Sequence, residues 1–217
     1  MTVTPAPDGP RRASQTRSEP PSTSKPDAKP KPKATGHIGL FLAQLVLRPN
    51  RIVALAPSST QLSRMMARDL GPETGSVIEL GSGTGKITRA ILDRGVPEER
   101  IAMFEINEAF TDLLAQSFPN AHLCKISAAR CDEAPLEDVG ATVSGLPLLS
   151  MPTQLQREIV GGAFRKMRPG GQFVQFTYGF RPPVDQAVRE ELGLRWTVSP
   201  KVWWNLPPAR VYTFVKA

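Results

Sequence analysis

The part of the sequence best suited to chemistry is a glycine-rich loop flanked by two carboxylates. Gly81, Gly83 and Gly85 remove side chains from a short loop, so that its backbone can approach a ligand closely. Glu79 precedes the loop and would repel a pyrophosphate, whereas it suits a cationic ligand that carries an amino group. Glu105 ends the next apolar run, at a position where an acid accepts hydrogen bonds from ribose hydroxyls. The pattern predicts a pocket for a positively charged nucleoside without phosphates, and no phosphate-cradling Gly-Lys-Ser/Thr ending is present in the loop.

Alternating strand and helix patterns surround this loop and must position it. Short apolar runs, typical of buried strands, alternate with segments that carry apolar residues at helical spacing. Such alternation favours a mostly parallel sheet with helices on both faces, with ligands bound beyond the carboxyl ends of the strands. The predicted strands are 77–80, 101–105, 121–126, 141–146, 172–178, 194–202 and 210–215; the predicted helices are 57–66, 87–92, 110–118 and 155–167; and 168–171 is a predicted turn.

The charge and cysteine content limit the classes of partner and compartment. The 217 residues carry a formal net charge of +7, which favours a polyanionic partner, either nucleic acid or an anionic membrane surface. The charge alone does not choose between the two. Cys124 and Cys131 form neither a disulfide framework nor a metal-ligand pattern, and we interpret them as reduced thiols of a cytoplasmic protein with no metal site.

The N-terminal region divides into two unlike segments. Residues 1–35 are rich in Pro, Ser, Thr and Lys, which predicts a disordered tail that either binds anionic lipid or serves only solubility. Residues 38–47 are apolar nearly all round and are followed by Arg48 and Arg51. A helix there fits a position in the membrane interface, with the arginines at lipid phosphates, and equally a position packed over the sheet edge. At about 10 residues it is too short to span a bilayer, and no signal-peptide pattern is present.

The loop and its neighbours resemble the cofactor motifs of class I S-adenosylmethionine-dependent methyltransferases. The resemblance rests on the segments 77–85 and 104–107. It implies a Rossmann-like α/β fold with a mostly parallel seven-stranded sheet, and S-adenosylmethionine as the cofactor. The acid that often follows the third strand is absent, and Ser127 and Ala128 stand there. The implied cofactor-binding residues are Glu79, Gly81, Ser82, Gly83, Thr84, Gly85, Glu105, Ile106, Asn107, Ser127 and Ala128.

Four further strings resemble the bacterial phospholipid N-methyltransferases, which convert phosphatidylethanolamine stepwise to phosphatidylcholine. They are Arg48-Pro49 with Ala56-Pro57-Ser58-Ser59, then 144–152, 175–179 and 204–209. The resemblance implies a disordered tail (1–35), a helical membrane-interface segment (36–68) that includes an N-terminal amphipathic helix, and a methyltransferase domain (69–217). It further implies a monomer on the inner face of the cytoplasmic membrane, in contact with anionic lipids and not with nucleic acid.

The acceptor side of the site is predicted from the ends of the fourth and fifth strands. Ser144, Gly145 and Leu146 would aim the amine, and Tyr178 would join them as a catalytic or substrate-binding group. Arg181 would hold the lipid phosphate, and Ser58 is also assigned to the substrate. Other interpretations stay open: Tyr178 as a rim aromatic, Arg181 as a solvated charge, and Trp203 and Trp204 as either interfacial or sheet-edge aromatics.

The main rival interpretation is an rRNA adenine N-methyltransferase, because the same glycine loop and the basic charge suit an RNA-modifying enzyme. Such enzymes place an aromatic after Leu-Pro of the fourth-strand motif to stack on the flipped base, and Leu148 stands at that position. They also carry a C-terminal helical domain, whereas only strands and loops are predicted after Tyr178. A cofactor-binding sensor without turnover is a third interpretation.

Overall fold

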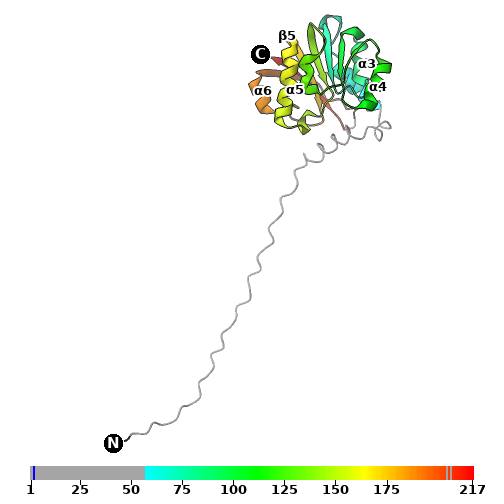
Figure 1. Cartoon of the computed structure of the whole chain (residues 1–217). Coiled ribbons are helices and arrows are strands. Elements are labelled where there is room, and N and C mark those ends of the chain that lie inside the picture. The colour runs from blue at the N-terminus through cyan, green and yellow to red at the C-terminus, as the bar shows by residue number, and fades with distance from the viewer. Residues whose placement is uncertain (1, 3–56, 204, 206) are drawn as a thin grey trace. The chain divides into compact units, whose positions relative to one another are not determined.

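The computed structural model describes residues 2, 57–203, 205 and 207–217 (Figure 1). The predicted tail (apart from residue 2) and the predicted apolar helix at 38–47 lie outside these residues, as does Trp204. Within the described residues no helix is both long enough and apolar enough to cross a membrane.

A seven-stranded sheet forms the centre of the fold, in the order β3-β2-β1-β4-β5-β7-β6. The first five strands pair in parallel, and β7 runs antiparallel to both β5 and β6. The carboxyl ends of β1 to β5 therefore meet at one edge, as the alternating pattern predicts. The strands are β1 (Ser76–Leu80), β2 (Ile101–Phe104), β3 (His122–Cys124), β4 (Val139–Ser144), β5 (Met167–Thr177), β6 (Leu194–Val198) and β7 (Arg210–Lys216).

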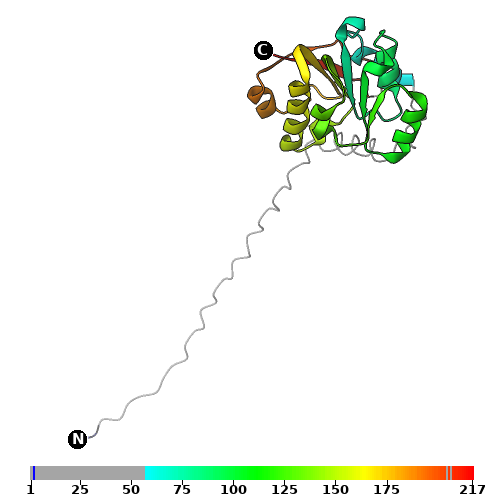
Figure 2. The ribbon, with the colours of Figure 1, turned by 45° about the horizontal axis from the view of Figure 1, so that its top comes forward.

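Helices cover both faces of this sheet, so the predicted Rossmann-like architecture is confirmed (Figures 1 and 2). One face packs against α2, α3 and α4, and the other packs against η5, α5 and α6. The helices are α2 (Pro57–Met66), α3 (Lys86–Leu92), α4 (Glu108–Ser117), α5 (Thr153–Lys166) and α6 (Gln186–Glu191), with short 3-10 helices η3 (Pro72–Thr74), η4 (Glu98–Arg100), η5 (Ala128–Glu133) and η6 (Leu148–Ser150).

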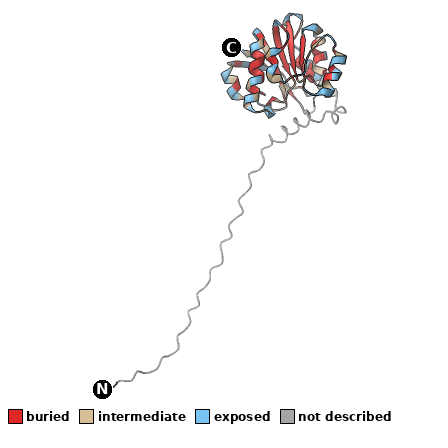
Figure 3. Ribbon diagram, in the orientation of Figure 1, coloured by how far each residue is buried: buried red, intermediate tan, exposed pale blue. Residues whose placement is uncertain are grey.

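The central strands are buried on both faces, which explains why they are continuous apolar runs in the sequence. In β1, Val77 faces the α2–α4 core, and the next residue, Ile78, faces the η5–α6 core. Figure 3 shows the buried residues concentrated along these strands. The sheet is consequently a rigid platform for the loops at its carboxyl edge.

Three features differ from the sequence predictions. The predicted turn at 168–171 is part of β5, which starts at Met167 with an irregular register against β4 and has Gly170 at a φ of +81°. A six-residue helix, α6, follows Tyr178, where only strands and loops were predicted. Leu62 in α2 is buried in the sheet core, so this described part of the predicted membrane-interface segment 36–68 belongs to the folded domain.

Candidate cofactor and acceptor site

The glycine loop leaves β1 in a backbone conformation that side chains rarely adopt. Gly81, Gly83 and Gly85 have φ angles of +73°, +51° and +73°. A Cβ on Gly85 would collide with the ring of Phe118 in the underlying core, whereas a Cβ on Gly83 would meet nothing within 4 Å. The third glycine thus fits the loop onto α4, and the second leaves open space above the loop.

Glu105 fixes the loop from the end of β2. Its Oε2 accepts a hydrogen bond from the Gly83 amide at 2.9 Å. Its Oε1 accepts from the amides of Ile106 and Asn107 at 2.9 and 2.8 Å. Three backbone donors therefore hold the carboxylate at the wall where the ribose acceptor was predicted, and the carboxylate in turn holds the loop.

A cavity of about 700 Å³ opens beside this loop at the carboxyl edge of the sheet. Its lining comes mainly from the loops after β1, β2, β3 and β4 and from the first two turns of α5, with further residues from the end of β2 and the first turn of α4. Ten of the predicted site residues lie in its wall: Gly81, Gly83, Thr84, Glu105, Ile106, Asn107, Ser127, Ala128, Gly145 and Leu146.

Glu79 lies beneath the loop and is not part of the cavity wall. Its side chain is fully buried on the α3 face, where Thr88 Oγ1 donates a hydrogen bond to Oε2 at 2.6 Å. Burial raises the pKa of the Glu79 carboxyl from its ordinary value of 4.5 to about 8, so the group is largely protonated at neutral pH. We expected an ionised acid facing the ligand. Contact between Glu79 and the cofactor stays a prediction.

Several features of this cavity fit S-adenosylmethionine. Glu79 Oε1 and Ser82 Oγ are buried beneath the loop, outside the cavity wall, without a hydrogen-bond partner in the described part of the chain. Gly83 leaves room at the wall, and Glu105 offers acceptor oxygens. Glu105 and the loop would hold the ribose and the methionine part of the cofactor.

The end of the cavity where the adenine is predicted is built from apolar walls and a capping serine. Ser127 caps η5, with its Oγ accepting from the Ala129 amide at 3.3 Å, and lines the cavity together with Ala128. The remaining apolar wall was not predicted from the sequence. Its residues carry the ordinary apolar spacing of core helices and strand ends, which gives no sign that they face a cavity: Phe110, Ile126, Met151, Leu155 and Ile159.

The acceptor loop after β4 lies directly against the cofactor loop. The Gly145 amide donates to the Leu80 carbonyl at 2.8 Å, and a Cβ on Gly81 would come within 2.7 Å of Leu146. Ser144 is fully buried, and its Oγ accepts from the Leu146 amide at 3.3 Å rather than lining the cavity. Gly145 and Leu146 thus lie where the acceptor loop was predicted, and Ser144 supports the loop from below.

Gln175 in β5 is a supporting residue to which the sequence analysis assigned no role. Its side chain is 1% exposed, and its Nε2 donates to the Leu146 carbonyl at 2.8 Å. The Leu148 amide donates to the same carbonyl at 2.9 Å. These two hydrogen bonds fix the orientation of the acceptor loop at the cavity wall.

The other predicted substrate residues lie away from the described cavity wall. Tyr178 packs into the α2-face core, with its ring 5.4 Å from that of Phe176, and hydrogen-bonds Asn205. Burial raises the pKa of its phenol. Arg181 is exposed in the loop after β5, and Ser58 lies in α2, with its side chain outside the described residues. Their roles toward the substrate stay predictions.

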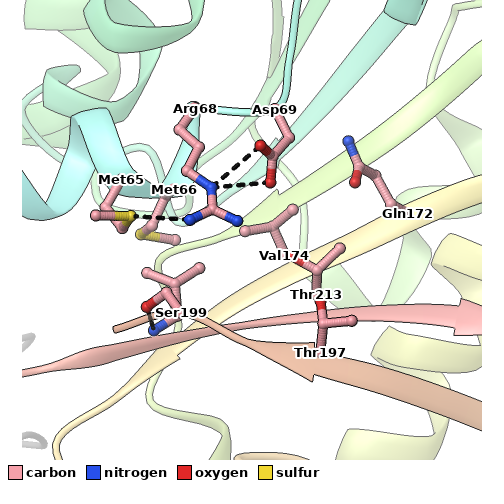
Figure 4. A pocket seen from close by; sticks show the side chains of 10 residues that line it. Met65, Met66, Arg68, Asp69, Gln172, Val174, Thr197, Ser199 and Thr213 are labelled. Atoms are coloured by element: carbon pink, nitrogen blue, oxygen red, sulfur yellow. Dashed lines mark hydrogen bonds and ion pairs between the residues drawn. The ribbon is translucent and has the colours of Figure 1, made fainter. Parts of the chain in front are cut away.

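A second depression, between α2 and the antiparallel part of the sheet, is not a candidate site (Figure 4). Its volume is about 10 Å³, which is room for about one water molecule. Arg68 lies over it, pairing with Asp69 at 3.0 Å and donating to the sulfur of Met65 at 3.8 Å.

The sheet order, the glycine loop and the carboxylate after β2 define the protein as a class I S-adenosylmethionine-dependent methyltransferase. The chain belongs to the family of the ornithine lipid N-methyltransferase of Singulisphaera acidiphila. The two are 34% identical over 183 residues, which cover 80% of this chain and 93% of that relative. No family model matches the chain.

Solved structures support the same fold. The chain is similar to a TehB-like methyltransferase from Corynebacterium glutamicum, at a TM-score of 0.58 and 16% identity, over 82% of this chain and 99% of the other. It is also similar to the glycopeptide N-methyltransferase MtfA in complex with S-adenosylmethionine, at a TM-score of 0.56 and 16% identity, over 73% and 94% of the two chains. At such identities the likeness concerns the fold and not the acceptor.

Proposed function

We propose that the protein methylates the amine of a lipid headgroup, and that its substrate is phosphatidylethanolamine, converted stepwise through mono- and dimethylated forms to phosphatidylcholine. The relative from Singulisphaera acidiphila is named for N-methylation of an ornithine lipid, which supports a lipid amine as the acceptor. The resemblance of residues 144–152 and 175–179 to phospholipid N-methyltransferases supports the finer choice.

The observation that carries the proposal is the composition of the cavity wall. Among the described residues that line it, Glu105 is the one ionisable side chain, and its oxygens are engaged by backbone amides. A largely apolar wall favours the neutral form of an amine, which is the form with a free lone pair. The part of the wall built from described residues provides no cations for an RNA backbone, which depends on them for affinity.

Leu148 further supports a lipid acceptor over an adenine in RNA. It occupies the position where the rRNA enzymes would place a stacking aromatic. Its side chain is 1% exposed and belongs to the η5–α6 core, so it has no surface to offer a flipped base. The short helix α6 buries Val188 in the same core and adds no separate helical domain within residues 57–217.

The chemistry assigned to this chain is positioning rather than acid–base catalysis. The bound cofactor supplies an activated methyl group on a sulfonium. The loop Gly145-Leu146-Pro147, fixed by Gln175, orients the amine lone pair toward that group. The new ammonium then loses its proton to water at the cavity opening before the next round. Alignment of this kind contributes roughly 7–11 kcal/mol toward the barrier.

In this proposal Arg181 and Tyr178 bind the phosphate of the lipid headgroup and do not contact the reacting amine. Arg181 is exposed, and no ion pair found among the described residues includes it, so its guanidinium is available to a phosphate. The place of action that goes with this substrate is the inner face of the cytoplasmic membrane, with the protein bound peripherally as a monomer.

The proposal is tested with purified full-length protein, labelled S-adenosylmethionine and three acceptors: phosphatidylethanolamine liposomes, ornithine lipid liposomes and undermodified ribosomal RNA. We expect label in mono-, di- and trimethylated phosphatidylethanolamine. Label in ornithine lipid alone would refute the phosphatidylethanolamine assignment while leaving lipid N-methylation, and label in RNA alone would overturn both. Absence of label from all three acceptors would favour a sensor. A Gly83→Val protein is the negative control.

A further inference from the structure

Two aromatic side chains project from the carboxyl edge of the sheet beyond the acceptor loop. Phe180, in the loop after β5, is 79% exposed, and Trp203, in the loop between β6 and β7, is 68% exposed. One exposed aromatic on a protein surface needs no explanation. Two exposed aromatic residues on adjoining loops, at the sheet edge that holds the candidate site, indicate an interaction surface.

Two cations lie against these rings. Lys201 Nζ is 4.3 Å from the centroid of the Trp203 ring and 5.7 Å from that of Phe180. The guanidinium of Arg210 is 5.9 Å from the Phe180 centroid. None of the ion pairs found among the described residues includes either cation. We call Phe180, Lys201, Trp203 and Arg210 the aromatic–cation rim.

Trp196 in β6 is 42% exposed, but its ring is held by neighbouring side chains and therefore provides a comparison for Trp203. Its ring lies 6.2 Å from that of the buried Phe214 and carries Arg189 at 4.6 Å. The Arg189 guanidinium is itself anchored, because its Nε donates to the Val184 carbonyl at 3.0 Å. Trp203, by contrast, makes no ring–ring contact with another described residue. Lys201, the cation that lies over its ring, forms no ion pair with a described carboxylate.

Exposed apolar residues continue from the rim along the cavity opening. Leu149 in η6 is 49% exposed, and its methyl carbon is 4.0 Å from the position a Cβ on Gly179 would occupy. Ile106, in the cavity wall after β2, is 73% exposed. Because β2, β4, β5 and β7 end or begin at one sheet edge, the apolar side chains follow that edge across the cavity.

From this arrangement we infer that the aromatic–cation rim docks the catalytic domain on a membrane that contains anionic lipid, with the cavity opening toward the headgroups. Aromatic rings with a cation beside them suit the headgroup level, where the ring enters the interface and the cation meets lipid phosphate. The inference rests on the proposed lipid acceptor and adds the surface by which that acceptor is reached. It is independent of residues 1–56.

Depth-dependent quenching of a single tryptophan tests the inference directly. A Trp196→Phe/Trp204→Phe protein retains Trp203, and a Trp203→Phe/Trp204→Phe protein retains Trp196 as the matched control. Both are mixed, as full-length chains, with phosphatidylethanolamine–phosphatidylglycerol vesicles that carry bromine on the acyl chains. We expect the brominated chains to quench at least half of the Trp203 emission and little of the Trp196 emission. Equal quenching of the two, or none of Trp203, would overturn the inference.

Sedimentation with the same vesicles tests the cations. Replacing Lys201 and Arg210 by Gln should lower the vesicle-bound fraction severalfold at low salt, whereas replacing Arg189 and Arg195 by Gln removes the same charge from the β6 side and should not. An unchanged fraction in the first protein would contradict the rim assignment. Cofactor affinity, measured by calorimetry, verifies that every variant is folded.

Failure of the inference is distinguishable from failure of the proposed function. Lipid dispersed in detergent micelles reaches the cavity without docking on a bilayer. Methylation in micelles together with unquenched Trp203 on vesicles would reject the rim and keep the lipid acceptor. Absence of methylation with every lipid in micelles would reject the proposed function, whatever the quenching shows.

Discussion

The two halves of the carboxyl edge of the sheet are built differently. The cofactor half, after β1 and β2, uses backbone: three glycines with positive φ and one carboxylate held by three amides. The other half, after β5 and before β7, exposes single side chains such as Phe180 and Trp203. We therefore expect a fixed loop to bind the cofactor, which a whole enzyme class shares, and replaceable side chains to surround the acceptor, which varies between enzymes.

The largest expected effect concerns the buried acid under the cofactor loop. Because the pKa of Glu79 is raised from 4.5 to about 8, the folded protein binds a proton more tightly than the unfolded chain. The contribution of Glu79 to the free energy of unfolding should be fully present below pH 4.5, fall as the pH rises toward 8, and level off above it. The fall is on the order of several kcal/mol at most. Glu79→Gln should remove it, as measured by urea unfolding from pH 4.5 to 8.5 without cofactor.

The exposed Glu73 gives the control for this measurement, because Glu73→Gln should leave the pH dependence intact. A slope that persists in Glu79→Gln would mean that another group carries it.

The second effect tests whether the cofactor half depends on bare backbone. Gly83→Val should weaken S-adenosylmethionine binding about 100-fold or more, because the side chain enters the open space at the cavity wall in a strained conformation. Gly170→Val is a matched control, since Gly170 has a φ of +81° and also meets nothing within 4 Å, but lies in β5. Calorimetry should show normal affinity for the control. Equal losses in the two would attribute the effect to backbone strain alone.

The third effect tests how much the Glu105 carboxylate contributes to cofactor binding apart from the glycine loop. Glu105→Ala removes the predicted ribose acceptor and frees three amides, and we expect about a 10- to 100-fold loss of cofactor affinity, the range for lost charge-assisted hydrogen bonds. Glu108→Ala, in the first turn of α4, removes an exposed carboxylate nearby and should change affinity little. A weak effect of Glu105→Ala would show that the glycines suffice.

The smallest expected effect lies in the acceptor half. Arg181→Gln should raise the KM for phosphatidylethanolamine about three- to tenfold, with little change in kcat, because an exposed phosphate contact adds binding and not alignment. Arg195→Gln, an exposed arginine in β6, is the control. A fall in kcat with an unchanged KM would contradict this prediction, because it would mean that Arg181 helps to align the reacting amine.

The same contrast explains how much could be predicted from the sequence. The strands are apolar runs because β1, β2 and β4 are buried on both faces, and the glycine loop is recognisable because its residues are adjacent in the chain. The prediction of a turn at 168–171 was wrong. The string Arg-Pro-Gly-Gly has the composition of a turn, but in the structure it is part of strand β5. The helix α6 was missed because six residues with one buried side chain carry almost no periodicity.

The rest of the site depends on distances that the chain does not encode locally. Met151 and Leu155 have the spacing of core residues, and only their place against the loop after β3 makes them cavity wall. Glu79 was predicted to be ionised, whereas burial raises the pKa of its carboxyl. That burial could not be predicted from the local sequence, since it depends on neighbours in space such as Met103 and Val143 on the adjoining strands.

The close approach of the loops after β1 and β4 restricts how this enzyme can be redesigned. A Cβ on Gly145 would come within 3.0 Å of the Gly81 carbonyl, so a larger residue there would push the two loops apart by a few tenths of an ångström, and any larger residue at Gly81 would be strained by its φ of +73°. An engineer who wishes to retarget the enzyme to a bulkier amine has to leave this junction untouched. The freedom lies further along the chain, at Met151 in the cavity wall and at the half-exposed Leu149.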